Sequence, residues 1–284
     1  MTAIYKSNEG ERLVRERYLA FLKYWPVPNE QLHMPTSPGS TFVVMSGSQD
    51  APALLLLHGG AANSAMWMGE VRAFAQTFRV YCVDMIGEPG LSAPARPSLA
   101  SDAYAAWLED VMNRLSIGRA SIVGISLGGW LALDYAIRRP DRVEKIAVLC
   151  PGGIGRQKVG IVFLTLLARL FGQRGRRRLM ERILGKSPVN PPPAMKPFID
   201  FVALIHRNFK PRMVKLPVFS DSALRGLNSP VLAIVGGRDV LLDSAQTKRR
   251  LEKLVPDARV KYLPDAGHLI TGQTAEILEF LKGD

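Results

Sequence analysis

Cysteine is scarce in this chain, and long apolar segments are missing. Only two of the 284 residues are cysteines, which argues against a disulfide framework; Cys82 and Cys150 each end an apolar run, so we expect buried free thiols. The longest apolar run, Val159 to Ala168, is too short to cross a bilayer of roughly 30 Å. The first residues also lack the basic-then-apolar order of a signal peptide. We therefore expect a cytoplasmic protein without a membrane span.

The chain also offers little for binding a metal or a nucleotide. It contains only four histidines, and they are not grouped with cysteines or acids at the spacing of a metal site. No glycine-rich phosphate-binding loop is evident. We therefore expect no cofactor, and the length suits one catalytic domain that carries an insertion.

Positive charge is in excess, and the excess lies in one segment. Residues 151–226 contain 15 Lys and Arg and only three acids, which accounts for the whole net charge of +12. Within this segment the apolar stretch Val159 to Leu170 is followed by the basic run Arg174 to Arg178. Two interpretations stay open: the arginines are solvated, or they contact an anionic membrane or amphiphile. Nucleic-acid binding is not expected, because interleaved aromatic residues are missing.

The same segment interrupts a regular alternation of short apolar runs and helix-length stretches. This alternation predicts a parallel sheet covered on both faces, so residues 1–150 and 227–284 are expected to form an α/β core that carries residues 151–226 as an insertion. The expected strands are 53–57, 79–84, 120–124, 144–150, 230–236 and 258–263, preceded by a hairpin of 31–35 and 41–47 at the sheet edge. The expected helices are 9–24, 66–77, 102–115, 128–138, 244–255 and 274–282.

The sequence Gly124-Ile125-Ser126-Leu127-Gly128 carries the clearest chemical signal. It follows an apolar strand and precedes a helical pattern, the context in which G-x-S-x-G forms a sharp turn that exposes the serine hydroxyl. Glycines two residues on either side let neighbouring backbone approach without a Cβ clash. The helix N-terminus also directs its amides and its positive dipole end at the serine. Ser126 is therefore the predicted nucleophile.

A serine nucleophile needs a base, and the base needs an orienting carboxylate. Of the four histidines, His268 lies in the loop after the last predicted strand, and Asp239 lies in the loop after the preceding strand. This gives the chain order Ser, Asp, His that accompanies such a serine turn. Asp243 is instead expected to cap the following helix, and Asp265 is too close to His268 in sequence to approach it from a neighbouring loop.

The backbone that follows the strand 53–57 supplies a second part of the predicted site. Acyl transfer places negative charge on a carbonyl oxygen, which two fixed backbone donors can stabilise. The amide of Leu127 is one predicted donor, and the amide of Gly60, or less favourably that of Ala61, is the other. His58 is expected to hold loop backbone through its ring, and Asp84 to end its strand by binding local amides.

In order along the chain, these motifs resemble the α/β-hydrolase superfamily, specifically its cap-bearing carboxylesterase, C–C hydrolase and proline-iminopeptidase-like branch. The resemblance is carried by residues 57–60, 83–92, 124–129, 236–239 and 266–268, with Trp67 shortly after the first of these. It implies the α/β-hydrolase fold, with a mostly parallel eight-stranded sheet flanked by helices. It also implies that residues 151–226 form a helical cap inserted after strand 6.

The resemblance further implies a carboxylesterase that acts through Ser126, His268 and Asp239 by way of an acyl-enzyme. Its partner would be a small-molecule ester, and the protein would be a monomer or a homodimer. C–C, lactone or thioester hydrolysis would use the same machinery and stays open, as does a non-catalytic receptor or scaffold. The expected substrate-binding residues are Gly59, Ala61, Trp67 and Ile125.

One turn departs from the family pattern. Many members read D-x-x-G-x-G-x-S after the strand that ends at Asp84, whereas this chain carries Glu88 and Pro89 before Gly90. The loop borders the active-site mouth in relatives, so the effect of Glu88 and Pro89 on substrate class is left open.

Overall fold

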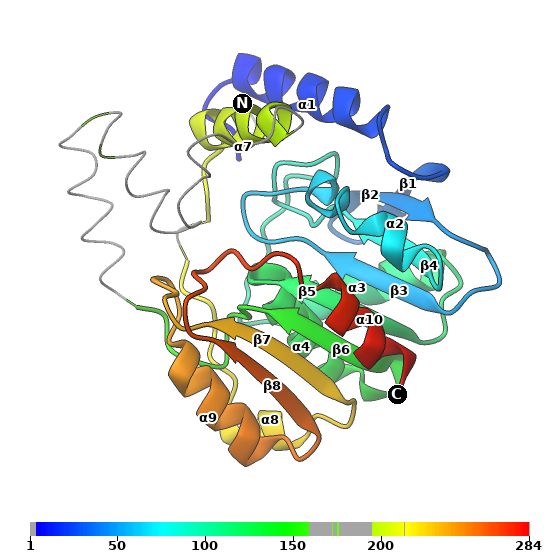
Figure 1. Ribbon diagram of the computed structural model, residues 1–284. Helices are drawn as coiled ribbons and strands as arrows, with labels where there is room; N and C mark the ends of the chain where they lie inside the picture. Colours follow the sequence, from blue (N-terminus) through cyan, green and yellow to red (C-terminus); the bar gives the residue numbers. More distant parts are fainter. Residues whose placement is uncertain (1–3, 159–171, 173–174, 176–194, 213, 284) are drawn as a thin grey trace.

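The centre of the protein is an eight-stranded sheet (Figure 1). The computed structural model describes residues 4–158, 172, 175, 195–212 and 214–283. Its strands are β1 (Asn29–Thr36), β2 (Gly39–Ser46), β3 (Ala53–Leu57), β4 (Arg79–Val83), β5 (Ala120–Ile125), β6 (Val143–Leu149), β7 (Val231–Gly236) and β8 (Ala258–Leu263). They lie in the order β1-β2-β4-β3-β5-β6-β7-β8, with β3 to β8 parallel and the β1–β2 hairpin antiparallel at one edge. The predicted mostly parallel sheet is confirmed.

The central strands are buried on both faces, as the unbroken apolar runs predict. In β3, Leu55 and Leu57 belong to one hydrophobic cluster, whereas Leu54 and Leu56 belong to another. Successive side chains of a strand point to opposite faces, so these leucines pack alternately into the cores on the two sides of the sheet. All four side chains are fully buried.

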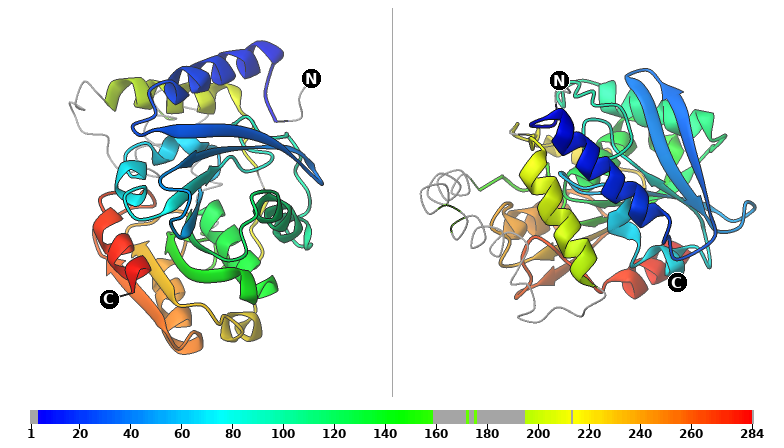
Figure 2. Two further views of the ribbon diagram at one scale, coloured as in Figure 1. Left: turned by 90° about the vertical axis from the view of Figure 1, so that its right-hand side faces the viewer. Right: turned by 90° about the horizontal axis from the view of Figure 1, so that it is seen from above.

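Helices cover both faces of the sheet (Figure 2). Buried residues of α3, α4 and α9 belong to one core cluster, and those of α2 and α10 to the other. The helices are α1 (Asn8–Leu22), α2 (Val71–Phe74), α3 (Ala103–Arg114), α4 (Leu127–Arg138), α7 (Lys196–Asn208), α8 (Asp221–Arg225), α9 (Ser244–Leu254) and α10 (Thr274–Lys282), with short 3-10 helices η1 (Ser64–Trp67) and η2 (Pro140–Arg142). No helix within these described segments is long and apolar enough to span a membrane.

The prediction of one continuous helix over 66–77 is wrong. The structure has η1 and then the separate one-turn helix α2, with the exposed Gly69 between them. The Asn63 side chain caps η1 by accepting a hydrogen bond from the Ala65 amide. The side chain and amide of Ser64 both bind Asp84. These polar contacts start the helical turn two residues early, and glycine weakens its continuation.

Helices α1 and α7 lie side by side above the sheet in the view of Figure 1, and the view from above in Figure 2 agrees. Phe201 of α7 stacks on Tyr18 of α1 at a ring-centroid distance of 6.2 Å and lies 5.0 Å from the Phe21 ring. The segment 151–226 therefore contributes one helix that contacts the N-terminal helix. Residues 159–171, 173–174, 176–194 and 213, which include the apolar stretch and the basic run, lie outside the described residues, so the division into core and cap stays a prediction.

Candidate active site

Ser126 lies in a strained turn between β5 and α4. Its backbone adopts φ +53° and ψ −105°, a left-handed conformation that costs a non-glycine residue energy. A Cβ on Gly128 would lie 2.2 Å from the Leu57 carbonyl oxygen, and one on Gly124 would lie 2.5 Å from the Gly128 carbonyl oxygen. Both glycines are therefore required for the close backbone approach that the sequence predicts at this turn.

The structure brings the three predicted triad residues into hydrogen-bond contact. The distance from His268 Nε2 to Ser126 Oγ is 2.9 Å, and that from His268 Nδ1 to Asp239 Oδ2 is 2.7 Å. The other carboxylate oxygen of Asp239 accepts hydrogen bonds from the amides of Leu241 at 2.7 Å and Leu242 at 3.0 Å. Asp239 is thus fixed on both oxygens while it holds the histidine ring.

These contacts assign the protons of the three residues. An ionised carboxylate can only accept hydrogen bonds, so Nδ1 of His268 donates to Asp239 and Nε2 is left to accept the Ser126 hydroxyl proton. Burial by itself would raise the pKa of Asp239. The hydrogen bond and charge of His268 and the two loop amides outweigh burial and hold that pKa below its usual value. Asp239 therefore stays ionised and keeps the imidazole in this tautomer.

The loops that carry Asp239 and His268 meet because β7 ends in glycine. A Cβ on Gly236 would lie 2.2 Å from the carbonyl oxygen of Gly267, so only glycine lets the loop that carries His268 approach this strand end. Cys150 follows β6 nearby, and its thiol lies 3.8 Å from the same Gly267 oxygen. Lys158 donates a hydrogen bond of 2.6 Å to the backbone oxygen of Asp239. No motif surrounds Lys158, so this contact could not be predicted from the sequence.

Two triad residues and Cys150 form the one cluster among the described residues whose donor atoms could meet a metal ion. Donor atoms of Cys150, Asp239 and His268 lie within 4.8 Å of one another. Asp239 and His268, however, already bind each other, and burial raises the pKa of the Cys150 thiol to about 12. A metal ion would have to break the first contact and deprotonate the thiol, so this donor set suits proton transfer better than metal binding.

The glycine turn after β3 lies against the serine turn. A Cβ on Gly59 would lie 3.9 Å from Ser126 Cβ, and one on Gly60 would lie 3.8 Å from the Leu127 side chain. The amides of Gly60 and Leu127 make no hydrogen bond within the described part of the chain, which leaves both free for a substrate oxygen. The Ala61 amide donates instead to Glu88 Oε2 at 2.6 Å, so the structure favours Gly60 over Ala61 as the second donor.

A buried polar network fastens this turn to the loop after β4. Nε2 of His58 accepts a hydrogen bond of 3.0 Å from the Met85 amide, and its Nδ1 lies 2.8 Å from the Gly59 carbonyl oxygen. The ring therefore holds loop backbone, as expected. Asp84 accepts from the Leu91 amide, as the sequence suggested, but also from Ser64 and from the hydroxyl of Tyr18 on α1. These last two contacts were not predicted.

The contact that Glu88 makes near the site is one that sequence reasoning missed. The Glu88 side chain is 2% exposed, and Oε1 has no hydrogen-bond partner among the described residues. Burial raises the pKa of Glu88 to about 7, against smaller opposing effects of the Ala61 amide and of Arg96 and Arg212. The departure of residues 87–90 from the family pattern was the available signal, but it did not show where the carboxylate points.

Two of the predicted substrate-binding residues are deeply buried. Trp67 is 3% exposed and belongs to the core cluster on the α2 and α10 face. Ile125 ends β5 in the same cluster and is 9% exposed. The described residues therefore place Trp67 in the core, whereas Ile125 and Gly59 adjoin Ser126.

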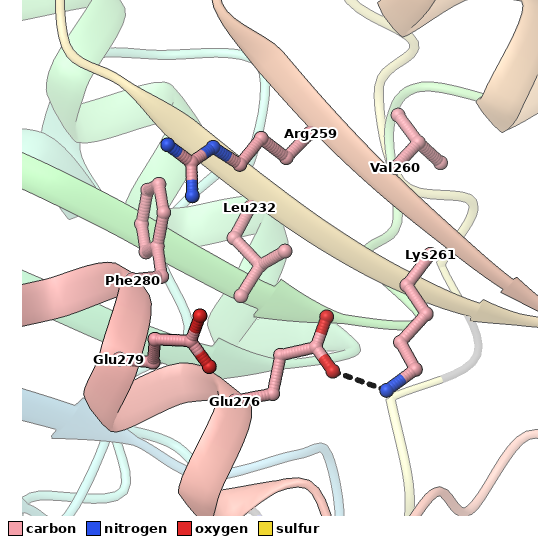
Figure 3. Close-up of a pocket in the computed structure, with 7 residues that line it drawn as sticks. All are labelled: Leu232, Arg259, Val260, Lys261, Glu276, Glu279 and Phe280. Carbon is pink, nitrogen blue, oxygen red and sulfur yellow. Dashed lines mark hydrogen bonds and ion pairs between the residues drawn. The ribbon is translucent and has the colours of Figure 1, made fainter. Parts of the chain in front are cut away.

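A pocket between β8 and α10 lies elsewhere on the sheet (Figure 3). Lys261 of β8 pairs with Glu276 of α10, and the Arg259 guanidinium lies 5.9 Å from the centre of the Phe280 ring. The residues that line this pocket come from β7, β8 and α10, and none belongs to the triad. The described residues of its lining include no histidine, cysteine, serine or threonine, so the pocket does not offer a nucleophile and a base together.

Comparisons with known proteins agree over nearly the whole chain. A family model described as the alpha/beta hydrolase fold matches residues 52–272. Carboxylesterase YbfK of Bacillus subtilis (strain 168) is 32% identical, with 94% of this chain and 93% of the relative covered. An uncharacterised carboxylesterase of the same strain, nap, is 31% identical, with 93% and 89% covered. The crystal structure of carboxylesterase CesB (YbfK) from Bacillus subtilis covers 97% of this chain and 99% of its own at 30% identity, with a TM-score of 0.82.

Proposed function

Because this chain belongs to the α/β-hydrolase fold family, we propose that it is a serine hydrolase that cleaves carboxylic esters. One observation carries the proposal. A single line of hydrogen bonds joins Ser126 Oγ, His268 and Asp239 at 2.9 and 2.7 Å, within the range expected of a nucleophile, its base and the group that orients the base. The relatives named as carboxylesterases supply the substrate class.

The proposed reaction passes through an acyl-enzyme. Ser126 Oγ attacks the ester carbonyl carbon while His268 Nε2 takes the hydroxyl proton, and the carbonyl oxygen becomes an oxyanion held by the amides of Leu127 and Gly60. His268 returns the proton to the leaving alcohol as the carbon–oxygen bond breaks. Water then repeats the sequence on the acyl-enzyme, and the carboxylic acid leaves. Asp239 stabilises the imidazolium in both steps and is not itself protonated.

Esters are favoured among carbonyl substrates because an alcohol leaves more easily than an amine or a carbanion. The site needs only to protonate the departing oxygen, which His268 can do from its position beside Ser126. Lactone, thioester and C–C hydrolysis remain the alternatives that the same residues could serve.

We also propose that the insertion 151–226 caps this site. Two described contacts support a position close to the triad. Lys158 bonds the backbone of Asp239, and α7 packs on α1, whose Tyr18 reaches the buried Asp84. The contact of the basic run with an anionic surface, the cytoplasmic location and the monomeric or dimeric state remain predictions from the sequence.

Hydrolysis of a p-nitrophenyl ester series, from acetate to palmitate, tests the proposal. The wild type and Ser126→Ala are compared in parallel, with equal folding verified by thermal melting. We expect kcat/KM to fall by at least about 10⁴-fold in the variant, because the nucleophile of an acyl-enzyme mechanism is removed. The preferred chain length then gives the size of the acyl site. An inactive wild type, or a variant that keeps its activity, would refute the esterase proposal.

A further inference from the structure

We propose that Glu88 is a positioning residue. It accepts a hydrogen bond from the Ala61 amide and so holds the oxyanion turn 58–64 in the conformation that directs the Gly60 amide at the substrate oxygen. The proposal rests on the proposed function, because an oxyanion turn has a role only in acyl transfer. The Ala61 amide bonds Glu88 Oε2 at 2.6 Å, directly next to the Gly60 amide that is the proposed donor. Glu88 therefore acts through the backbone and need not touch substrate.

The turn needs an external acceptor because its own backbone is not self-supporting. Glycine has wide conformational freedom, so the peptides at Gly59 and Gly60 could rotate away from Ser126. Ala61 itself adopts φ +55°, a conformation that a residue with a Cβ keeps only when its surroundings impose it. Asp84 fastens the far end of the turn through Ser64, but near Gly60 the described side-chain acceptor is Glu88. Losing that acceptor frees the Gly60 amide to turn.

The carboxylate is itself held in place by its own loop. Arg96 donates through Nε to the Gly87 carbonyl oxygen at 2.9 Å and through Nη2 to the Lys210 carbonyl oxygen at 2.7 Å. Arg212 pairs with the Tyr104 hydroxyl. The titratable groups whose charges act on Glu88 are thus Arg96 from its own loop and Arg212 from the segment after α7. This bracing lets a buried carboxylate reach the Ala61 amide with little freedom to move.

The geometry requires an acceptor and not a charge. A negative charge this close to a developing oxyanion would oppose the reaction, since like charges repel strongly where water is excluded. Protonation on Oε1, which has no partner among the described residues, leaves Oε2 able to accept. A glutamine in this position could present its carbonyl oxygen to Ala61 in the same way. A role in binding a substrate cation would instead require the charge.

Two substitutions separate these roles. Glu88→Met keeps the length of the side chain and removes the acceptor, whereas Glu88→Gln keeps an acceptor without charge. Glu70→Met is the matched control. Burial raises the pKa of Glu70 as well, and its Oε2 has no hydrogen-bond partner among the described residues. The readouts are kcat and KM for p-nitrophenyl butyrate and the inhibition constant of butylboronic acid, whose adduct with a serine resembles the tetrahedral intermediate.

We expect Glu88→Met to lower kcat by about 10- to 100-fold, less than the loss of an entire donor, with KM within about threefold of the wild type. The boronate inhibition constant should rise in parallel with the fall in kcat/KM. Glu88→Gln should keep at least about a third of the wild-type kcat, and Glu70→Met should not differ from the wild type.

Three results would overturn the proposal. The first is a Glu88→Met enzyme with wild-type kcat, the second is a change confined to KM, and the third is a Glu88→Gln enzyme as impaired as Glu88→Met. If Glu88→Met does not fold, Glu88→Gln decides alone, because a loss of kcat beyond about tenfold in that variant contradicts a role as acceptor. A wild type that cleaves no ester would instead refute the proposed function, so the two failures are distinguishable.

Discussion

Two turns face each other at the candidate active site, and they are held in place by different means. Backbone holds the serine turn: Ser126 donates its amide to the Leu149 carbonyl oxygen of β6, and its glycines allow backbone to approach within van der Waals range. Side chains hold the glycine turn after β3, because Glu88 and Asp84 of a separate loop accept hydrogen bonds from its backbone amides. The serine turn thus rests on backbone contacts that its own glycines permit, whereas the glycine turn depends on two particular side chains 20 to 27 positions away.

The largest expected effect breaks the serine turn through its backbone. In Gly128→Ala the new Cβ would lie 2.2 Å from the Leu57 carbonyl oxygen and 2.6 Å from that of His58. The first oxygen belongs to β3 and the second to the turn that follows it, so neither can move without disrupting the site. We therefore expect a loss of at least about 3 kcal/mol in the free energy of unfolding, or failure to fold. Urea denaturation followed by circular dichroism measures it.

Gly60→Ala is the matched substitution in the glycine turn. Its Cβ would meet the Leu127 side chain at ordinary contact distances of 3.8 and 3.9 Å. The free energy of unfolding should therefore change by less than about 1 kcal/mol. Equal losses at Gly128 and Gly60 would show that backbone crowding holds both turns and would remove the distinction between them.

The next effect concerns the acid that holds the glycine turn, and it depends on pH. Burial raises the pKa of Glu88 from its usual 4.5 to about 7, so between pH 4.5 and pH 7 the unfolded chain releases a proton that the folded protein keeps. The folded state therefore loses stability as pH rises through this window, by on the order of 3 kcal/mol in total. Below about pH 4.5 this cost is absent.

Glu88→Gln isolates that effect because it removes the titration and keeps the acceptor. We expect the variant to be more stable than the wild type at pH 8 and the difference to shrink as pH falls toward 4.5. Chemical denaturation of both proteins at several pH values measures the difference, in which all other titrating groups cancel. A difference that stays constant with pH would show that Glu88 does not carry the raised pKa.

The same contrast explains what could be predicted from sequence. Strand runs such as 53–57 and 120–124 and the Gly124 to Gly128 turn depend on local composition, and the structure has them at the predicted positions within one or two residues. The meeting of Ser126, Asp239 and His268 follows from strand order in a parallel sheet.

The contacts that sequence could not predict are made by side chains from distant segments. Glu88 could have pointed to solvent like most glutamates, and only its burial against Ala61 shows its role. The Tyr18 to Asp84 contact joins residues 66 positions apart. The helix predicted over 66–77 failed for the same reason, because the Ser64 contact with Asp84 outweighs a helical pattern.

The smallest effect sharpens the comparison, because both turns contain a non-glycine residue at positive φ. Ala61→Gly relieves the strain at φ +55° but adds freedom to the unfolded chain, and the two effects nearly cancel. We expect a stability change under about 1 kcal/mol and a kcat within about twofold of the wild type.

If Glu88 holds the turn, the same substitution in a Glu88→Met background should lower kcat further, since neither the acceptor nor the Ala61 Cβ then restricts the backbone. A double-mutant cycle on kcat measures this coupling. Strict additivity would mean that Ala61 and Glu88 act independently on the turn.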